Sequence, residues 1–141
     1  DGRIVFYRQP TRSHTLNTPF DVSNLCTLPR VDIVYAYGGS DRLLIDAVRE
    51  NNSDGMVMSG FGSGTFPPIM LEAGSDCLKE GMVVVLGSRS TAGRIVPTPK
   101  TSKLGFVVAD NLHPQKARIL LMLSLTLTSD VVAIQEFFDE F

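Results

Sequence analysis

The chain has 141 residues, of which 43% are hydrophobic and 20% charged, and its formal net charge is −2. This length fits one domain with a core of its own, and the composition is not that of a disordered chain. Lysines and arginines are spread along the sequence, so no cationic cluster indicates a nucleic-acid or anionic-membrane surface. The longest apolar run, residues 119–127, is interrupted by Ser124 and Thr126 and is too short to span a bilayer.

Two cysteines, Cys26 and Cys77, and two histidines, His14 and His113, are the residues best suited to a disulfide or a metal site. A disulfide agrees with the count alone. A domain of this size does not need one, however, and we expect two reduced, mostly buried thiols. Neither histidine has a Cys or His at ligand spacing, which argues against a metal. We predict no cofactor.

The first 28 residues do not have the pattern of a folded core. Residues 4–7 form a short β-prone run, predicted to be one arm of a hairpin, and the opening suggests a fragment of a longer chain. Residues 9–24 are polar and rich in turn formers, as linkers are. Within them, Phe20 and Val22 alternate with polar residues and predict a brief strand or an anchor.

From Val31 onward, β-prone apolar runs alternate with helical patterns. Sequential strand–helix–strand units predict a parallel sheet with helices on both faces, a Rossmann-like α/β fold. We therefore assign residues 1–28 to the end of a hairpin and a linker, and residues 29–141 to one α/β domain. About four strands are predicted, over residues 31–37, 56–59, 82–86 and 104–108, and helices over residues 43–50, 69–79, 114–125 and 131–138.

The helical patterns predict which side chains face the core. Ser40 or Asp41 is the expected cap of the first helix. The helix over residues 114–125 is apolar nearly all round, which indicates burial on several sides, including a subunit interface. Residues 91–103 are predicted to be irregular. The expected inner faces are Leu43, Leu44, Ala47 and Val48 in the first helix, and Ile69, Met70, Ala73, Cys77 and Leu78 in the second.

Ligands of parallel sheets bind where strands end, so the loops at the carboxyl edge are the candidate sites. Residues 37–40, 60–65 and 87–93 follow the first three strands. In the second loop, Gly60, Gly62 and Gly64 alternate, which lets backbone amides turn toward an anion or carbonyl before the next helix begins. A purely structural turn is the simpler interpretation of this pattern. The dinucleotide fingerprint and the P-loop are not matched.

Catalytic groups are sparse. Ser88 and Thr91 follow a strand and His113 is a candidate base, but an exposed polar residue at a helix start is the simpler interpretation of His113. Arg89 and Arg94 are more simply surface residues than ligands of an acidic group. Helix carboxylates such as Asp41, Asp46, Glu50, Glu72 and Asp76 are most simply solvated, whereas Asp32 lies within a strand pattern. The residues predict no self-sufficient active site and no catalytic residue.

Several segments, in order along nearly the whole chain, resemble bacterial type II L-asparaginases. The glycine loop resembles that family's GxGNG or GxGSG loop, and residues 88–93 its SSRxxxG turn. Other similar segments are Tyr7–Thr15, Thr18–Ser23, Val31–Tyr37, Gly105–Val107, which matches GFV, and Asn111–Arg118, which is close to LNPQKAR.

The resemblance implies that residues 29–141 are the C-terminal α/β domain of an enzyme that hydrolyses L-asparagine, and often L-glutamine, to the acid and ammonia. It places the nucleophilic threonine in an N-terminal domain absent from this chain, so that the chain alone is predicted inactive. It further implies a close dimer, a tetramer of two such dimers, and a periplasmic or secreted location, with a cytoplasmic one left open. The resemblance also assigns a substrate contact to Ser63, in a loop whose backbone is formed by Gly62 and Gly64.

One expected residue is missing. Many members have a glutamate before the GFV segment that contacts the substrate's amino group, whereas residues 95–104 contain no acid and Thr98 lies nearest by spacing. This leaves two alternatives to the enzyme domain. One is a non-catalytic binding or assembly module that kept the fold. The other is a nucleotide- or anion-binding domain that uses the glycine loop.

Overall fold

The computed structural model describes residues 4, 7 and 8 and residues 11–141. The hairpin arm predicted over residues 4–7 lies partly outside the described residues. In chain order the elements are β1 (Val31–Tyr35), α1 (Leu43–Glu50), β2 (Gly55–Gly60), α2 (Pro68–Lys79), β3 (Val83–Ser88), α3 (Pro99–Leu104), β4 (Val107–Val108), α4 (Pro114–Leu125) and α5 (Val131–Glu140).

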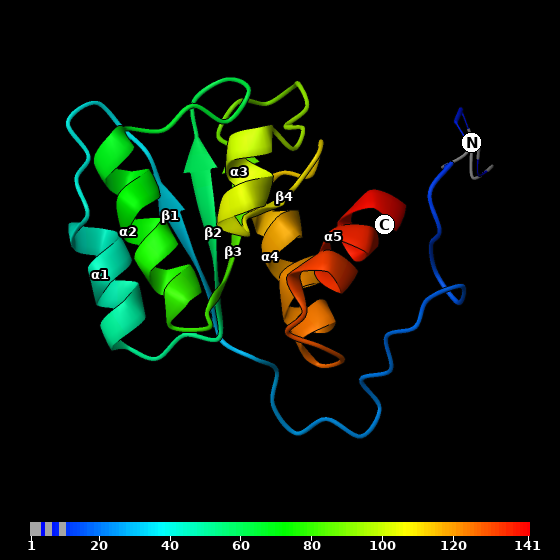
Figure 1. The fold of residues 1–141 in the computed structure, drawn as a ribbon. Helices are drawn as coiled ribbons and strands as arrows, with labels where there is room; N and C mark the ends of the chain where they lie inside the picture. Colours follow the sequence, from blue (N-terminus) through cyan, green and yellow to red (C-terminus); the bar gives the residue numbers. More distant parts are fainter. Residues whose placement is uncertain (1–3, 5–6, 9–10) are drawn as a thin grey trace.

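The four strands form one parallel sheet in the order β1-β2-β3-β4, which confirms the predicted Rossmann-like α/β class. Parallel strands that follow one another in space and sequence are joined by crossovers of one hand, which places the connecting helices on one face. Figure 1 shows α1 and α2 together on that face, while α4 and α5 cover the other. Helices therefore lie on both faces.

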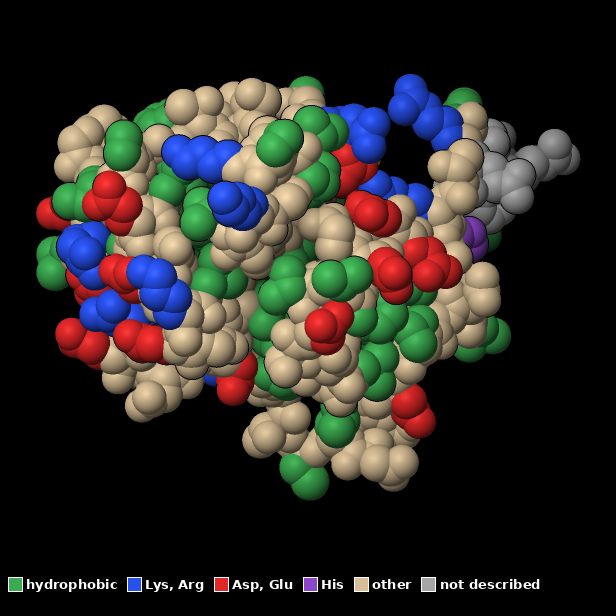
Figure 2. All heavy atoms as spheres, in the orientation of Figure 1, with side chains coloured by type: hydrophobic (Ala, Val, Ile, Leu, Met, Phe, Trp, Pro, Cys, Tyr) green, Lys and Arg blue, Asp and Glu red, His purple; other side chains and the backbone are tan. Residues whose placement is uncertain are grey.

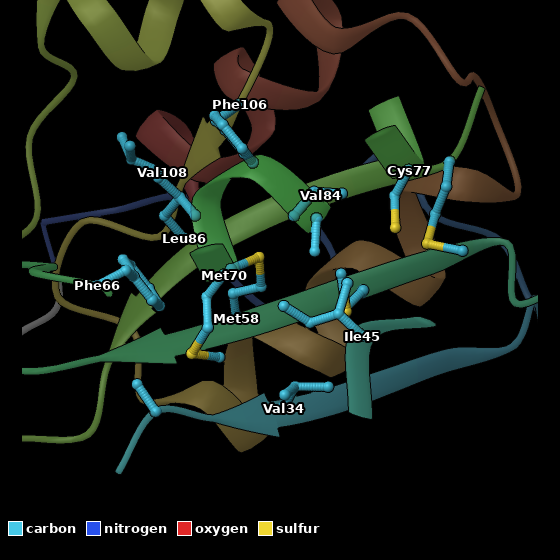
Figure 3. Packing of buried hydrophobic residues seen from close by; sticks show 14 of the residues in the cluster. Val34, Ile45, Met58, Phe66, Met70, Cys77, Val84, Leu86, Phe106 and Val108 are labelled. Carbon is cyan, nitrogen blue, oxygen red and sulfur yellow. The ribbon is translucent and has the colours of Figure 1, made fainter. Parts of the chain in front are cut away.

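Alternation along the strands divides the core into two layers. In β2, Met56 and Met58 point to the α1/α2 side and Val57 to the α4/α5 side, and all three are fully buried. The first layer combines these methionines with Met70 and Cys77 of α2. Figure 3 shows Met58, Met70 and Cys77 in this layer. The second layer comprises Val31, Val57, Val83, Val85, Val107, Ala109, Ala117, Leu120, Leu121, Ile134 and Phe138.

The predicted inner face of α1 is wrong in part. Ile45 is fully buried, whereas Leu43 is 68% exposed and Leu44 48% exposed. The helix lies over the edge strand β1 and packs inward through a narrow stripe, to which Val48 also belongs. Leucines beside that stripe meet solvent. The expected cap, Ser40 or Asp41, does not occupy the N-cap position, which is Arg42 and has no side-chain capping bond. The Asp41 carboxylate, one residue earlier, accepts a hydrogen bond from the Leu43 amide at 2.9 Å.

The inner face of α2 is largely as predicted. Met70, Ala73 and Cys77 are buried and Leu78 packs partly against the same layer. Ile69 is the exception, because it lies in the first turn, and 41% of it is exposed.

Residues 91–103 are not wholly irregular, because they contain most of α3. The Thr98 hydroxyl accepts a hydrogen bond from the Thr101 amide, and the Thr101 hydroxyl accepts one from the Thr98 amide. Pro99 occupies the first turn of the helix. Thr98 followed by Pro99 is a helix-start signal in the sequence, although the third helical position holds Thr101 and not the Glu or Gln of the usual capping box. The helix ends at Leu104 and is capped by Gly105, so the strand predicted over residues 104–108 is shortened to β4.

Residues 11–30 form no helix or strand and run along the α4/α5 side (Figure 1). The Phe20 ring lies 5.2 Å from that of Phe137 and 5.4 Å from that of Phe141, so Phe20 is an anchor. Both cysteines are free, and Cys77 is buried as expected, but Cys26 is exposed because it lies in this segment. In the described part of the chain, no helix is long and apolar enough to cross a membrane.

Candidate functional site at the carboxyl edge of the sheet

The loops after β1, β2 and β3 meet at the carboxyl edge, as the parallel sheet requires. Arg89 joins all three. Its backbone amide donates to the Gly60 carbonyl at 2.9 Å, and its guanidinium donates to the Ala36 carbonyl at 2.7 Å. The Ser88 hydroxyl donates to the Gly62 carbonyl at 2.5 Å. The glycine loop is therefore braced by the end of the neighbouring strand.

The glycine loop is a tight, internally bonded turn. The Phe61 amide donates to the Thr65 carbonyl at 2.9 Å, and the amides of Gly64 and Thr65 donate to the Phe61 carbonyl at 2.9 and 2.8 Å. Gly62 and Gly64 adopt φ angles of 48° and 92°, in the left-handed region that favours glycine. A side chain at Gly64 would also come within 3.1 Å of the Ile95 Cδ1 atom.

Ser63 stands exposed between these glycines. The structure fixes its backbone through the turn on both sides and leaves its hydroxyl without a hydrogen-bond partner among the described residues. This geometry presents one small polar side chain outward from the edge of the domain. Such a group can contact a ligand held mainly by another domain.

Arg89 is a brace and not a free ligand for an acidic group. Its guanidinium carbon lies 5.4 Å from the centroid of the Phe61 ring, at cation–π distance, while it also bonds Ala36. Sequence reasoning missed this role. Phe61 follows β2 and Arg89 follows β3, so no local spacing in the sequence relates the ring to the cation.

An anion would find few free donors here. The first turn of α2 begins with Pro67 and Pro68, which have no amide hydrogen, and the amides of Met70 and Leu71 donate to the Pro67 carbonyl. The loop amides of Gly64 and Thr65 are satisfied internally. Anion binding at a helix start needs several unsatisfied amides. The arrangement therefore argues against the nucleotide-binding alternative.

Comparison with known proteins agrees with this geometry. The model of the glutaminase/asparaginase C-terminal domain matches residues 30–138. The chain belongs to the glutaminase/asparaginase C-terminal domain family. The predicted resemblance to asparaginases is thereby confirmed.

The chain is 39% identical over its whole length to L-asparaginase 2 of Escherichia coli, and 37% identical to the probable periplasmic L-asparaginase of Haemophilus influenzae. It covers 41% of each of these proteins. Among solved structures, it matches a probable cytoplasmic L-asparaginase of Campylobacter jejuni with a TM-score of 0.95 and 42% identity, covering 100% of this chain and 46% of that one. The chain thus spans about two fifths of the length of these curated relatives. Relatives with periplasmic and cytoplasmic names both match, so membership does not specify a compartment.

Two other candidate residues, His113 and Ser88, have structural partners. His113 precedes α4, and its Nδ1 lies 3.0 Å from the Gln115 side-chain oxygen. The Ser88 hydroxyl is engaged with Gly62. Among the described residues, no hydrogen bond joins His113 to Ser88 or Thr91, and no cluster of three or more metal-binding side chains is found. The geometry gives no nucleophile–base pair here.

Asp32 lies at the opposite edge of the sheet, where β1 begins. Burial raises the pKa of its carboxyl, but hydrogen bonds from Ser53 and Arg30 outweigh burial and lower the pKa overall. The carboxylate thus ties the start of β1 to the turn before β2. Thr98, the nearest residue to the missing glutamate, is occupied as the cap of α3.

Asp110 is the residue that sequence reasoning overlooked. It lies two residues after β4, its side chain is only 9% exposed, and its two carboxylate oxygens pair with Arg12 and Arg94. An Asp-Asn pair after an apolar run is a turn signal in the sequence. Nothing in the sequence indicates the two cations, because they come from distant segments.

Proposed function

We propose that this domain is the C-terminal part of an amidohydrolase that converts L-asparagine, and also L-glutamine, to the acid and ammonia. The observation that carries the proposal is the family match over residues 30–138, together with a glycine loop that presents an exposed Ser63. The described residues supply no nucleophile–base pair. The catalytic threonine therefore belongs to an N-terminal domain, as the resemblance implies.

In this proposal Ser63 contributes one hydrogen bond to substrate, in an active site whose other residues belong to another subunit. The loop suits that task, since its backbone is braced by Ser88 while its tip is open. A preorganised loop loses little entropy when the substrate binds. Gly62 and Gly64 supply the backbone shape and not a chemical group.

Assembly with partner chains is supported by an apolar groove beside α4 and the linker. It has a volume of about 440 Å³, and Ile119, on its rim, is 50% exposed. Exposed apolar grooves of this kind are typical of surfaces that pack against another chain or domain. We propose that another copy of the protein covers it within a close dimer or tetramer. Its lining includes Phe20, Leu112, Ile119, Leu120, Leu123 and Phe141.

A non-catalytic assembly module is the second candidate, and one observation favours it. No acid occurs in residues 95–104, and the Thr98 hydroxyl is used within α3, so this domain offers no carboxylate there to a substrate ammonium group. We expect weaker selection for free α-amino acids even if the intact protein is an enzyme.

Ammonia release separates these candidates. The chain would be expressed with the coding sequence that precedes it, and separately as residues 11–141, and both would be assayed with asparagine and glutamine. We expect activity in the longer protein and none in the shorter one. A longer protein without a threonine-based site and without ammonia release would support the assembly module. Hydrolysis by the shorter chain would contradict the assigned role.

The role of Ser63 is tested by Ser63→Asn in the active longer protein. Serine leaves more room than asparagine, so we expect the ratio of kcat/KM for glutamine to that for asparagine to fall by about 3- to 10-fold. Ser90→Asn is the matched control, because Ser90 is an exposed serine in the neighbouring loop. An unchanged ratio in the Ser63 variant, or an equal change in the control, would exclude the proposed contact.

A further inference from the structure

Asp110 connects two segments that are far apart in the sequence. Arg12, from the linker, bonds one of its carboxylate oxygens, and Arg94, from the loop after β3, bonds the other. Arg12 and Asp110 are 98 positions apart. The carboxylate is 9% exposed, while the Arg94 side chain is 70% exposed. The two cations thus hold a nearly buried charge from opposite sides.

The main chain of Asp110 extends the connection toward the glycine loop. Its carbonyl accepts from the Ile95 amide at 2.9 Å, in an isolated antiparallel bridge. Ile95 is 5% exposed, and its side chain lies against Gly64 so closely that a Cβ there would come within 3.1 Å. Asp110 therefore positions Ile95, and Ile95 supports the turn that carries Ser63.

The linker side of Asp110 is equally well fixed. Arg12 also donates to the Phe138 carbonyl at 3.0 Å, and the Ser13 hydroxyl donates to the Glu140 carboxylate at 2.9 Å. Phe20 also packs against Phe137 of α5 and against Phe141, which caps it, and these contacts hold the linker along that helix. Asp110 is the point at which the linker and the loop after β3 share one partner.

We propose that Asp110 is a positioning residue that couples the linker to the Ser63 loop through Arg94 and Ile95. Charge-assisted bonds to a nearly buried carboxylate are stronger than neutral ones, and loss of either arginine leaves that charge poorly compensated. A linker joined to an N-terminal domain thereby helps to set the place of the substrate contact. The catalytic consequence rests on the proposed function of Ser63, whereas the coupling itself does not.

Hydrogen exchange in this chain tests the coupling without any activity. Phe61, Gly64 and Thr65 have amides bonded within the glycine loop and are the reporters. Asp110→Asn removes the charge and keeps a residue that tolerates the φ of 50°. We expect this variant and Arg94→Gln to raise exchange at the reporters by about fivefold or more. Arg94→Lys, which keeps a cation, should restore most of the protection.

The Arg12→Gln variant tests whether Arg12 stabilises the glycine loop or only holds the linker in place. If the coupling exists, reporter exchange rises by about twofold or more along with exchange in the linker. Arg30→Gln is the control, because that residue pairs with Asp32 at the opposite edge of the sheet and should leave the reporters unchanged. Reporters at the native rate in both Asp110→Asn and Arg94→Gln would overturn the proposal. Linker exchange that rises alone in Arg12→Gln would overturn the coupling to the linker.

The intact protein provides the second measurement. We expect Arg94→Gln to raise KM for asparagine by about 3- to 10-fold while kcat changes by less than about twofold, since the threonine chemistry lies elsewhere. Changed reporters with no hydrolysis by the unmodified intact protein would refute the proposed function and leave the coupling standing. Hydrolysis with unchanged KM and unchanged reporters would refute the positioning role and leave the function standing.

Discussion

The two helix pairs that cover the sheet have similar inner faces and different outer faces. On the α1/α2 side, Arg42 pairs with Asp46 at 2.6 Å and reaches Asp76 at 3.3 Å, and Lys79 pairs with Asp76 at 2.8 Å. On the α4/α5 side, the outer surface includes the apolar groove beside Ile119. Figure 2 shows charges of both signs gathered over α1 and α2, and more hydrophobic surface around α5.

The contrast separates a solvent-facing surface from one suited to partners. Charged side chains of both signs keep the α1/α2 surface solvated. Each exposed ion pair contributes little to the free energy of unfolding. Apolar side chains around a groove contribute hydrophobic free energy only when another surface covers them and removes them from water. The fold alone needs the inner faces, so the exposed groove beside α4 is the surface on which we propose that another copy packs.

The largest expected effect contrasts the inner and outer faces of α5. Phe138 is fully buried, so Phe138→Ala should lower the free energy of unfolding by about 3–5 kcal/mol in urea titrations. Phe137, its neighbour, packs against Phe20 at the surface, and Phe137→Ala should cost only about 1 kcal/mol. Equal losses would mean that both faces of α5 belong to the core of one chain.

A smaller effect contrasts the two outer faces. Ile119→Lys places a charge on the rim of the groove, and we expect it to weaken self-association of the intact protein by about tenfold or more in sedimentation experiments. Leu43→Lys is the matched control, since Leu43 is 68% exposed on α1. An equal change in both variants, or no change in Ile119→Lys, would contradict the assignment of the groove as the partner surface.

The smallest effect concerns the ion pairs of the α1/α2 side. The hydrogen bond from Arg42 is the main cause that lowers the pKa of Asp46. A carboxyl whose folded pKa is lowered adds stability above its unfolded pKa of about 4 and loses it as pH falls through the folded value. Asp46→Asn should therefore lower Tm by about 2–4 °C at pH 7, with the difference vanishing near pH 2.

Salt provides a check on that prediction. The pair is partly exposed, so about 1 M salt should reduce the Tm difference at pH 7. A difference that persists at pH 2 would show that Asp46 acts through packing and not through its charge.

Much of the fold was predictable because its signals are local. The runs that became β2 and β3 are buried throughout, and such continuous apolar runs indicate strands of a parallel sheet. The helix α3 was also encoded locally, by Thr98 and Pro99, but the surrounding turn residues obscured it. Burial of Ile45 in place of Leu43 was not predictable from the period alone, because it depends on the edge position of β1.

The candidate site was predictable in part. Alternating glycines predicted the loop, and similarity to a family assigned Ser63 to substrate, a role that stays a prediction. The braces around the loop were not visible in the sequence. Ser88, the last residue of β3, donates to the Gly62 carbonyl. Arg89, the next residue, contacts the Phe61 ring and the Ala36 carbonyl, which follow β2 and β1.

The sequence by itself determined a parallel α/β domain of the asparaginase family with a glycine loop at its carboxyl edge, because periodicity, turn chemistry and motif order are properties of neighbouring residues. Only the tertiary structure decided that Arg12 and Arg94 meet on Asp110, and that α4 lines an apolar groove together with Phe20 and Phe141. Those contacts join segments up to 98 positions apart. Local patterns do not specify such pairings, which arise only when the sheet brings the loops to one edge.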